Sequence, residues 1–207
     1  MVDMFCKQDL CETIKDILNN RPPHHIQDGD SHYALAAVLV PIFKMNDEYH
    51  LLFTKRAPRV KYHQGHICFP GGVVDPADGS PEETVLREVH EEIGLSKGDV
   101  EILGPIDDSL TFVPPFIIQP FVGLIPHPYP FDINPEEVEK ILEVPLEFLA
   151  SQVSKDDVTA AEIAPGSFYP EFRYKGELIW GTTASILANF LGILIKRWPC
   201  RNKLTDF

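Results

Sequence analysis

The stretch FPGGVVDPADGSPEETVLREVHEEIGL runs from Phe69 to Leu95 and carries five glutamates in its second half. The signals of a helix surround them. Ser80-Pro81-Glu82-Glu83 has the form of a capping box, and Pro81 falls at the first helical position, where its missing N–H costs nothing. Gly94 supplies a stop. An apolar stripe at helical spacing lies between these signals: Val85, Leu86, Val89 and Ile93.

The opposite face of this predicted helix carries Glu88, Glu91 and Glu92, whose carboxylates converge. Like charges at this spacing repel by about 0.2–0.5 kcal/mol per pair. Glu82 and Glu83 are explained by the cap and by the positive helix N-terminus, but the other three lie too far along the helix. One interpretation is a solvated acidic face. The other is a site for a hard divalent cation, beside a glycine turn that could bring backbone carbonyls to the same point.

The run from Arg87 to Leu95, REVHEEIGL, resembles the REUxEExGU core of the Nudix box, with Gly72 as its leading glycine. Nudix enzymes hydrolyse a nucleoside diphosphate linked to another group, and they use a divalent metal. The box is stretched here, because Gly72 lies fifteen residues before Arg87, one more than in the family pattern. Gly79 stands where that pattern has a glutamate. A box of this stretched form is similar to that of one branch, the coenzyme A pyrophosphatases.

The residues before the box resemble the signature of the same branch, L-L-T-x-R-(S/A)-x3-R-x3-G-x3-F-P-G-G. The chain reads LFTKRA from Leu52 to Ala57, then Lys61, Gly65 and FPGG from Phe69 to Gly72, with the spacing intact. Lys61 replaces an arginine, and it offers a point charge instead of a bidentate fork. Further similar segments follow: Pro120–Gly123, Glu137-Val138, Val144–Leu146 and Ile179–Ala184, after which Ser185 replaces an arginine.

The resemblance implies a role for each acidic residue of the box. Glu88 and Glu92 are expected to bind the metal, Mg²⁺ or Mn²⁺. Glu91 is a third ligand or shapes the water network, and the backbone carbonyl of Gly71 is a further candidate ligand. Arg87 is expected to hold carboxylates by bidentate hydrogen bonds. The implied reaction is attack of a metal-activated water on a pyrophosphate phosphorus. The general base stays open among Glu88, Glu136 and Glu137.

A second group of residues is basic and comes just before the glycine turn. Lys55, Arg56, Arg59 and Lys61 lie within seven residues, and His63 and His66 follow. The cluster is either a solvated loop that balances the acidic helix or a clamp for substrate phosphates, with Arg56, Arg59 and Lys61 as the binding residues. Three aromatic residues could stack an adenine or could serve packing alone: Phe116, Tyr129 and Phe131.

Composition limits the classes of function. A net charge of −13 argues against nonspecific binding to nucleic acid or to a membrane surface, so a polyanionic substrate must be met by local cations or metal. No signal peptide is recognisable, and the apolar run 186–195 is too short to span a bilayer. We expect a cytoplasmic protein with reduced thiols and with a small nucleotide as its partner. The sequence leaves open whether the protein forms a homodimer. The cysteines are Cys6, Cys11, Cys68 and Cys200.

The chain is expected to form one Nudix domain over residues 1–207, in which residues 1–30 are a helical N-terminal extension. The expected class is α/β (α+β), and the resemblance implies an α/β/α sandwich with a mixed, curved sheet. Helices are predicted at 8–19, 146–152 and 182–198, besides the one at the Nudix box. Strands are predicted at 34–40 (ended or bent at Pro41), 50–54, 99–104, 109–113 and 116–125, and a hairpin with Lys175-Gly176 at its turn near 167–181.

Three hypotheses for function remain at this point. The first is a coenzyme A or acyl-CoA pyrophosphatase, which releases adenosine 3′,5′-bisphosphate and a pantetheine phosphate. The second is a Nudix hydrolase of another nucleotide, such as a dinucleotide polyphosphate, ADP-ribose or an NAD-type substrate, which the changes at Lys61 and Ser185 leave open. The third is a nucleotide sensor with the Nudix fold and no hydrolysis. The intact trio of Glu88, Glu91 and Glu92 argues against this last hypothesis.

Overall fold

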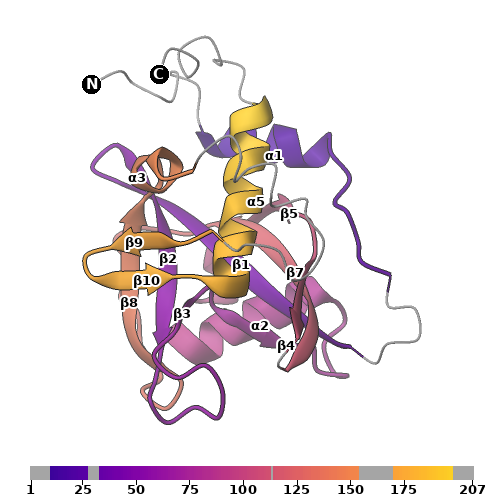
Figure 1. Cartoon of the computed structure of the whole chain (residues 1–207), viewed down its shortest axis with the longest axis vertical. Helices are drawn as coiled ribbons and strands as arrows, with labels where there is room; N and C mark the ends of the chain where they lie inside the picture. The colour runs from indigo at the N-terminus through magenta and orange to yellow at the C-terminus, as the bar shows by residue number, and fades with distance from the viewer. Residues whose placement is uncertain (1–9, 28–32, 113, 154–169, 198–207) are drawn as a thin grey trace.

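A computed structural model describes residues 10–27, 33–112, 114–153 and 170–197 (Figure 1). Within them, eight strands form a mixed sheet with the order β3-β2-β1-β7-β5, to which β4 adds beside β1, β6 beside β7 and β8 beside β2. β1 runs parallel to β7 and antiparallel to β2. The strands are β1 (Ala34–Met45), β2 (Glu48–Arg56), β3 (Ile67–Cys68), β4 (Gly71–Val73), β5 (Glu101–Pro105), β6 (Ser109–Phe112), β7 (Pro115–Leu124) and β8 (Val138–Pro145).

Helices cover both faces of this sheet, as expected for an α/β/α sandwich. α1 (Leu10–Asn19), α3 (Leu146–Ser151) and α5 (Gly181–Arg197) pack on one face, and α2 (Pro81–Ile93) packs on the other (Figure 1). Alternation along the strands divides the core accordingly, because successive side chains point to opposite faces. In β1, Val40 and Ile42 join the cluster under α5, whereas Leu39 joins the cluster under α2. The predicted fold class is confirmed.

The first predicted strand was too short, because β1 continues through Pro41 to Met45. Leu39 donates its N–H to the Pro70 carbonyl at 2.9 Å. The backbone nitrogen of Pro41, two residues further along the strand, therefore points to the same edge of β1. On that side β1 pairs with β4 up to Val38 and with β2 only from Ile42. Pro41 therefore lies where the partner changes and where no neighbouring strand requires its missing N–H.

Helix α1 packs against the main core although it lies in the expected N-terminal extension. Its residues Leu10, Ile14 and Leu18 are buried in the cluster that also contains residues of α5. After the helix, Arg21 forms an ion pair with Asp107, and the backbone N–H of His24 donates to the same carboxylate at 2.7 Å. The division into a single domain stays a prediction, which this shared core favours.

A two-stranded sheet, β9 (Phe172–Tyr174) and β10 (Glu177–Ile179), leads into α5 and confirms the predicted hairpin. It is joined to the main sheet by ion pairs. Glu177 binds the ammonium of Lys55 in β2 at 3.1 Å and that of Lys140 in β8 at 2.7 Å. The residues that directly follow β10 are thereby held against the sheet.

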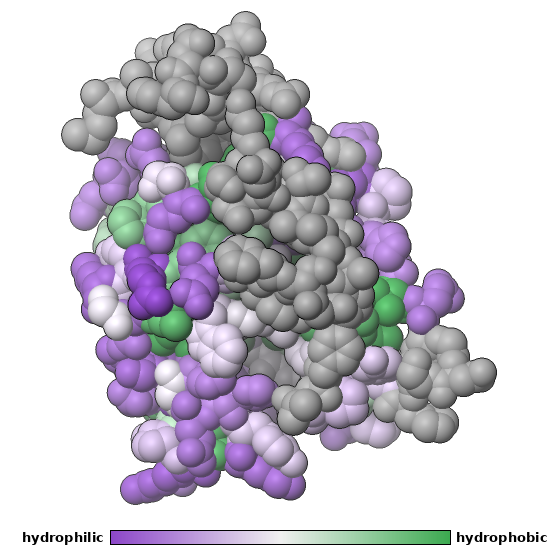
Figure 2. Space-filling model, in the orientation of Figure 1, coloured by the Kyte–Doolittle hydropathy of each residue, from purple (hydrophilic) through white to green (hydrophobic). Residues whose placement is uncertain are grey.

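The surface agrees with the acidic, mixed composition. Hydrophilic residues cover most of the coloured surface of the face shown in Figure 2, with apolar side chains in small areas between them. No helix in the described part of the chain is long and apolar enough to cross a membrane. Cys68 has a free thiol, whereas Cys6 and Cys200 lie outside the described residues.

Candidate active site

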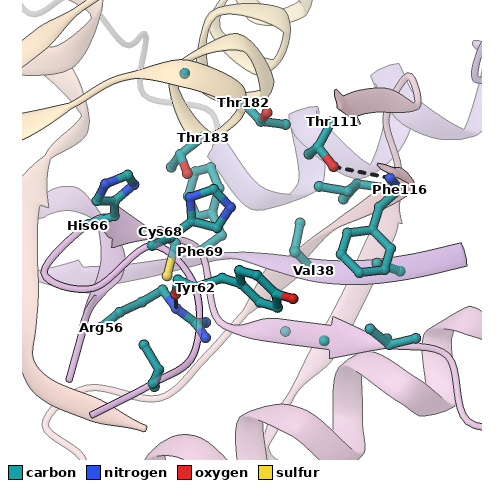
Figure 3. Close-up of a pocket in the computed structure, with 18 of the residues that line it drawn as sticks. Val38, Arg56, Tyr62, His66, Cys68, Phe69, Thr111, Phe116, Thr182 and Thr183 are labelled. Atoms are coloured by element: carbon teal, nitrogen blue, oxygen red, sulfur yellow. Dashed lines mark hydrogen bonds between the residues drawn. The ribbon is translucent and has the colours of Figure 1, made fainter. Parts of the chain in front are cut away.

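A cavity of about 940 Å³ opens between β4 and α2 on one side and the start of α5 on the other. Figure 3 shows residues from several elements pointing into it, among them Arg56, Tyr62, Val38 and Phe116. The charged side chains that line the cavity are Arg56, Lys61, Glu88, Glu92, Glu136 and Glu137. Residues far apart in the sequence, which carry opposite charges, therefore meet in one place.

Helix α2 begins and ends where the sequence predicts. Ser80 caps it by accepting from the backbone N–H of Glu83 at 3.2 Å, and Gly94 closes it in the left-handed region with φ of 68°. The second half of the capping box differs from the expectation, because the Glu83 carboxylate accepts from the N–H of Gly79 at 2.8 Å. The helix is fixed at both ends, which sets the direction of the glutamates on its inner side.

Glu92 is the most enclosed of these glutamates, with 4% of its surface exposed. Its Oε2 atom is buried and has no hydrogen-bond partner among the described residues. Burial raises the pKa of Glu92 to about 8; the charge of Arg56 and the N–H of Gly71 oppose that rise, and the charges of Glu88 and Glu137 add to it. Burial likewise raises the pKa of Glu88, against the hydrogen bond from Arg87. Both carboxylates lack sufficient compensation for their charge.

Strand β4 brings its backbone to the same place. The bonds Leu39 N–H to Pro70 and Val74 N–H to Leu35, both 2.9 Å, fix the alternation of the antiparallel pair with β1. By that alternation Gly71 faces away from β1, so its carbonyl lies outside the ladder. Gly71 also has a φ of 149°, and a Cβ there would lie 2.3 Å from the carbonyl oxygen of Ala37. Only glycine fits this position.

Gly72 is needed for a different reason, the room beside Glu88. A Cβ built on Gly72 would lie 2.3 Å from Glu88 Oε1. The carboxylate thus packs directly on the glycine backbone. The leading glycine of the Nudix box and Glu88 are therefore neighbours in space.

Two carboxylates and a free carbonyl suit a hard divalent cation. No three His, Cys, Asp or Glu side chains of the described residues are arranged to hold a metal ion as they stand. Mg²⁺, however, is commonly held by one or two protein carboxylates, with waters and substrate phosphates as its other ligands. The unpartnered Oε2 of Glu92 and the Glu88 carboxylate beside Gly72 provide such a set.

Arg87 binds several acceptors and does not line the cavity. It holds Asp78 through two bonds, Nε to Oδ1 at 3.0 Å and Nη2 to Oδ2 at 2.9 Å. It also donates to Glu88 at 2.7 Å, to Glu91 at 3.2 Å and to the carbonyl of Val73 at 3.3 Å. Arg87 therefore ties α2 to the turn before it and to β4. Glu91 is half exposed and, unlike Glu88 and Glu92, is not among the lining residues.

The structure separates the basic residues that the sequence groups together. Arg56 and Lys61 line the cavity, with His63 and His66. Arg59 is exposed and lies outside the described lining, where it donates to Glu136 at 2.7 Å. Lys55 points to Glu177 and Glu139. Two of the three expected phosphate-binding residues thus reach the candidate site.

The candidates for the general base, Glu88, Glu136 and Glu137, all line the cavity. Glu137 lies near enough to Glu88 and Glu92 for its charge to raise the pKa of both. Glu136 is paired with Arg59. The choice among the three stays open.

Aromatic residues of the cavity were largely missed by reading the sequence. Tyr129 and Phe131 contact each other, with ring centroids 5.1 Å apart, and pack against the cluster under α2. Of the three aromatic candidates, Phe116 lines the cavity. Tyr62 and Trp180 line it as well; Tyr62 follows Lys61 of the signature and Trp180 lies in the similar segment Ile179–Ala184, which were the signals that could have pointed to them.

The comparison with known proteins agrees with this geometry. The family model of the NUDIX domain matches residues 33–168. The chain belongs to the Nudix family. A protein described as the uncharacterized Nudix hydrolase NudL of Photorhabdus laumondii is 36% identical over 166 residues, which cover 80% of this chain and 86% of the relative. The NudL protein of Yersinia enterocolitica is 35% identical over 196 residues, or 90% of this chain and 95% of the relative.

A solved structure shows the same Nudix fold. The MutT/nudix family protein from Enterococcus faecalis has a TM-score of 0.53 at 15% identity, and the match covers 90% of this chain and 70% of that protein. Nudix hydrolases cleave pyrophosphate bonds and generally use divalent ions such as Mg²⁺ or Mn²⁺. The present chain is a Nudix hydrolase in this sense.

Proposed function

We propose that this Nudix hydrolase cleaves the pyrophosphate bond of coenzyme A or acyl-CoA, with Mg²⁺ or Mn²⁺. The products are adenosine 3′,5′-bisphosphate and (acyl-)4′-phosphopantetheine. One observation carries the proposal: residues of two separate motifs line the same cavity. Glu88 and Glu92 come from the Nudix box, and Arg56 and Lys61 come from the segment that resembles the coenzyme A signature.

In this proposal the acidic side of the cavity is the metal site. Glu88 and Glu92 bind the ion, and the Gly71 carbonyl is the backbone ligand. Glu91 contributes to its water shell, and Arg87 acts by holding Glu88 and Glu91 in position. When bound, the metal lowers the pKa of a coordinated water and neutralises charge on phosphoryl oxygens.

The basic side of the cavity binds the substrate. Arg56 and Lys61 are placed to receive phosphate oxygens, which orients the pyrophosphate toward the glutamates. Water attacks one phosphorus, the bond from that phosphorus to the bridging oxygen breaks, and the bridging oxygen leaves with the other phosphate. The proton of the water passes to one of Glu88, Glu136 and Glu137.

A second candidate is a Nudix hydrolase of another nucleoside diphosphate derivative, such as a dinucleotide polyphosphate, ADP-ribose or an NAD-type compound. The position of Arg59 favours it, because one of the three cations expected to bind substrate phosphates is paired with Glu136 instead. A sensor without hydrolysis is the third candidate. We also propose a cytoplasmic location, with which the free thiol of Cys68 agrees.

The deciding experiment is a substrate panel with Mg²⁺ and with Mn²⁺, in which the products are identified by mass. Coenzyme A should give adenosine 3′,5′-bisphosphate, and it should be preferred over dephospho-coenzyme A. A charge-assisted hydrogen bond is worth about 1.5–3 kcal/mol, so losing one lowers kcat/KM about ten- to a hundredfold. Hydrolysis of ADP-ribose or a dinucleotide in place of coenzyme A would establish a hydrolase of another nucleotide. No turnover of any compound would establish the sensor without hydrolysis.

Variants identify the cation that binds the 3′-phosphate, which is the group that coenzyme A has and dephospho-coenzyme A lacks. Arg56→Met or Lys61→Met should lower kcat/KM for coenzyme A and leave the dephospho form less affected. Lys61→Arg should be tolerated, since the related signature has arginine there. Lys44→Met is the matched control, because Lys44 forms a surface ion pair with Asp47 and lies outside the described lining of the cavity. Equal losses of kcat/KM on both substrates would show that the basic residues act through their overall positive charge and do not bind the 3′-phosphate.

A further inference from the structure

Two aromatic side chains at the cavity are more exposed than their size would suggest. Among the described residues, the exposed large hydrophobic side chains are Tyr62 (46%), Val73 (48%), Phe148 (39%) and Trp180 (46%). An apolar residue that is exposed singly needs no explanation. Tyr62 and Trp180, however, come from different segments and line the same cavity. Exposed rings that line one concave site indicate contact with a ligand.

Trp180 is held at the cavity by the elements on either side of it. It follows β10 directly, and Glu177 of that strand is bound to Lys55 and Lys140 of the main sheet. On the cavity side His66 packs against the indole, with ring centroids 4.8 Å apart and an angle of 54° between the planes. Burial, followed by the charges of His63 and Arg56, lowers the pKa of His66, so the imidazole is mostly neutral at pH 7. The indole is supported by the protein and still has nearly half of its surface free.

Tyr62 is held by the backbone around Arg56. The Arg56 N–H donates to the His66 carbonyl at 2.9 Å, and Arg56 Nε donates to the carbonyl of Tyr62 at 3.3 Å. The ammonium of Lys61 lies 5.0 Å from the centroid of the Tyr62 ring. Figure 3 shows the ring projecting into the cavity, in view between Arg56 and Val38. Tyr62 therefore stands beside the two cations that are proposed to bind phosphate.

We propose that the purine base of the substrate binds by stacking on Trp180 and Tyr62. The inference rests on the proposed function, in which the substrate carries adenosine 3′,5′-bisphosphate. That half of the molecule is a planar ring next to phosphates, and the cavity offers rings next to Arg56 and Lys61. Aliphatic side chains that line the cavity as well, Val38, Ile118 and Ile186, suit the pantetheine arm.

Stacking has a consequence for specificity. Every nucleobase has an aromatic face, so recognition by stacking tolerates a change of base. The enzyme should therefore accept analogues in which adenine is replaced by hypoxanthine or guanine, with KM values within about tenfold of one another. Loss of the ring altogether should matter far more than its exchange.

The kinetic test compares three aromatic positions. Base–aromatic stacking is worth about 1–3 kcal/mol per base by alanine substitution, which corresponds to about a five- to 150-fold change in affinity. Trp180→Ala and Tyr62→Ala should raise KM for coenzyme A by a factor in this range and change kcat little, whereas Trp180→Phe should retain most of the affinity. Phe148→Ala is the matched control, because Phe148 is exposed but lies outside the described lining. An unchanged KM in Trp180→Ala would overturn the proposal.

A binding test on the native chain does not depend on turnover. The chain has two tryptophans, Trp180 and Trp198, so parent protein and Trp180→Phe are titrated in parallel and their fluorescence compared. Adenosine 3′,5′-bisphosphate should quench the parent saturably and the variant much less. 4′-Phosphopantetheine, which has no ring, should leave both almost unchanged. A signal from phosphopantetheine equal to that of the bisphosphate would place the pantetheine arm on the rings and overturn the proposal.

The two tests also separate this inference from the proposed function. If coenzyme A is not hydrolysed but adenosine 3′,5′-bisphosphate quenches Trp180, the stacking site stands and the coenzyme A assignment falls. If coenzyme A is hydrolysed, KM is unchanged in Trp180→Ala and the bisphosphate causes no quench that depends on Trp180, the stacking site falls and the assignment stands.

Discussion

The glutamates of α2 form two groups that differ in what surrounds their carboxylates. Glu83, in the first turn, is exposed and accepts a hydrogen bond from Gly79 at 2.8 Å. Glu92, in the last turn, is buried, and its Oε2 has no partner among the described residues. The first carboxylate stabilises the helix N-terminus. The second costs free energy unless a cation binds it. The same residue type on one helix thus serves folding at one end and, as we propose, catalysis at the other.

The strongest test of this contrast is to neutralise one glutamate of the first turn, Glu82 or Glu83, and one that lines the cavity, Glu88 or Glu92. Metal-assisted stabilisation of a transition state is worth several kcal/mol, so Glu92→Gln should lower kcat by about 10²–10⁴-fold. Glu82→Gln should leave kcat nearly unchanged, because Glu82 is exposed in the first turn. Initial rates at saturating Mg²⁺ are the measurement.

Stability should move in the opposite direction to activity. Without metal, Glu92→Gln should unfold at the same temperature as the parent or higher, since the amide removes the cost of burying a charge near Glu88. Near-parental turnover in Glu92→Gln would remove Glu92 from the metal site.

Metal binding should appear in the unfolding temperature as well. A ligand that binds only the folded state adds about 2.7 kcal/mol at a hundredfold excess over Kd. For a chain of this length that amounts to about 5–10 °C in Tm. Thermal melts with and without Mg²⁺ should show this shift in the parent and in Glu82→Gln, and much less of it in Glu92→Gln. Superimposable melts for the parent would favour the sensor without hydrolysis.

The smallest expected effect concerns an acidic group that is fully satisfied, Asp78. The two bonds from Arg87, followed by one from Thr84, hold the pKa of Asp78 well below its usual range. A carboxyl whose pKa is lower in the folded state stabilises the protein above the unfolded pKa of about 3.9, and this contribution is lost as the pH falls further. Asp78→Asn should therefore lower Tm by a few degrees at pH 7, and the difference from the parent should shrink below about pH 4.

The control for this titration is Asp47→Asn. The Asp47 side chain is 96% exposed and lies 3.1 Å from Lys44 in a surface ion pair. Such pairs contribute little, so Tm should follow the parent at every pH. A difference for Asp78→Asn that stays constant down to pH 2 would show that the bonds from Arg87 do not depend on the charge of Asp78.

Local signals allowed much of the fold to be predicted. Ser80, Pro81 and Gly94 mark the ends of α2 because caps depend on residues that are neighbours in the chain. The turn between β1 and β2 is equally local. Asn46 and Asp47 both have positive φ, and Met45 pairs with Glu48 across this two-residue turn.

What could not be predicted depends on contacts between distant segments. Strand β8 was missed, because charged residues follow each other along it and it becomes a strand by pairing with β2. The short strand β4 is likewise defined by its pairing with β1. In the site, the motif identifies Glu88 and Glu92, but the separation of Arg59 from Arg56 follows from where Glu136 lies. Trp180 reaches the cavity only through the anchoring of its hairpin.

Gly72 gives the molecule an unusual vulnerability. The atoms that a Cβ would meet there belong to the flexible end of Glu88, at 2.3 Å, and not to the backbone. A methyl group at residue 72 would therefore leave β4 paired with Ala37 and would only turn one carboxylate aside. A gene that acquired this change would still encode every acidic and basic residue of the site. If Glu88 binds the metal, as we propose, one nucleotide substitution would thus give an inactive protein that motif searches restricted to charged residues would still count as active.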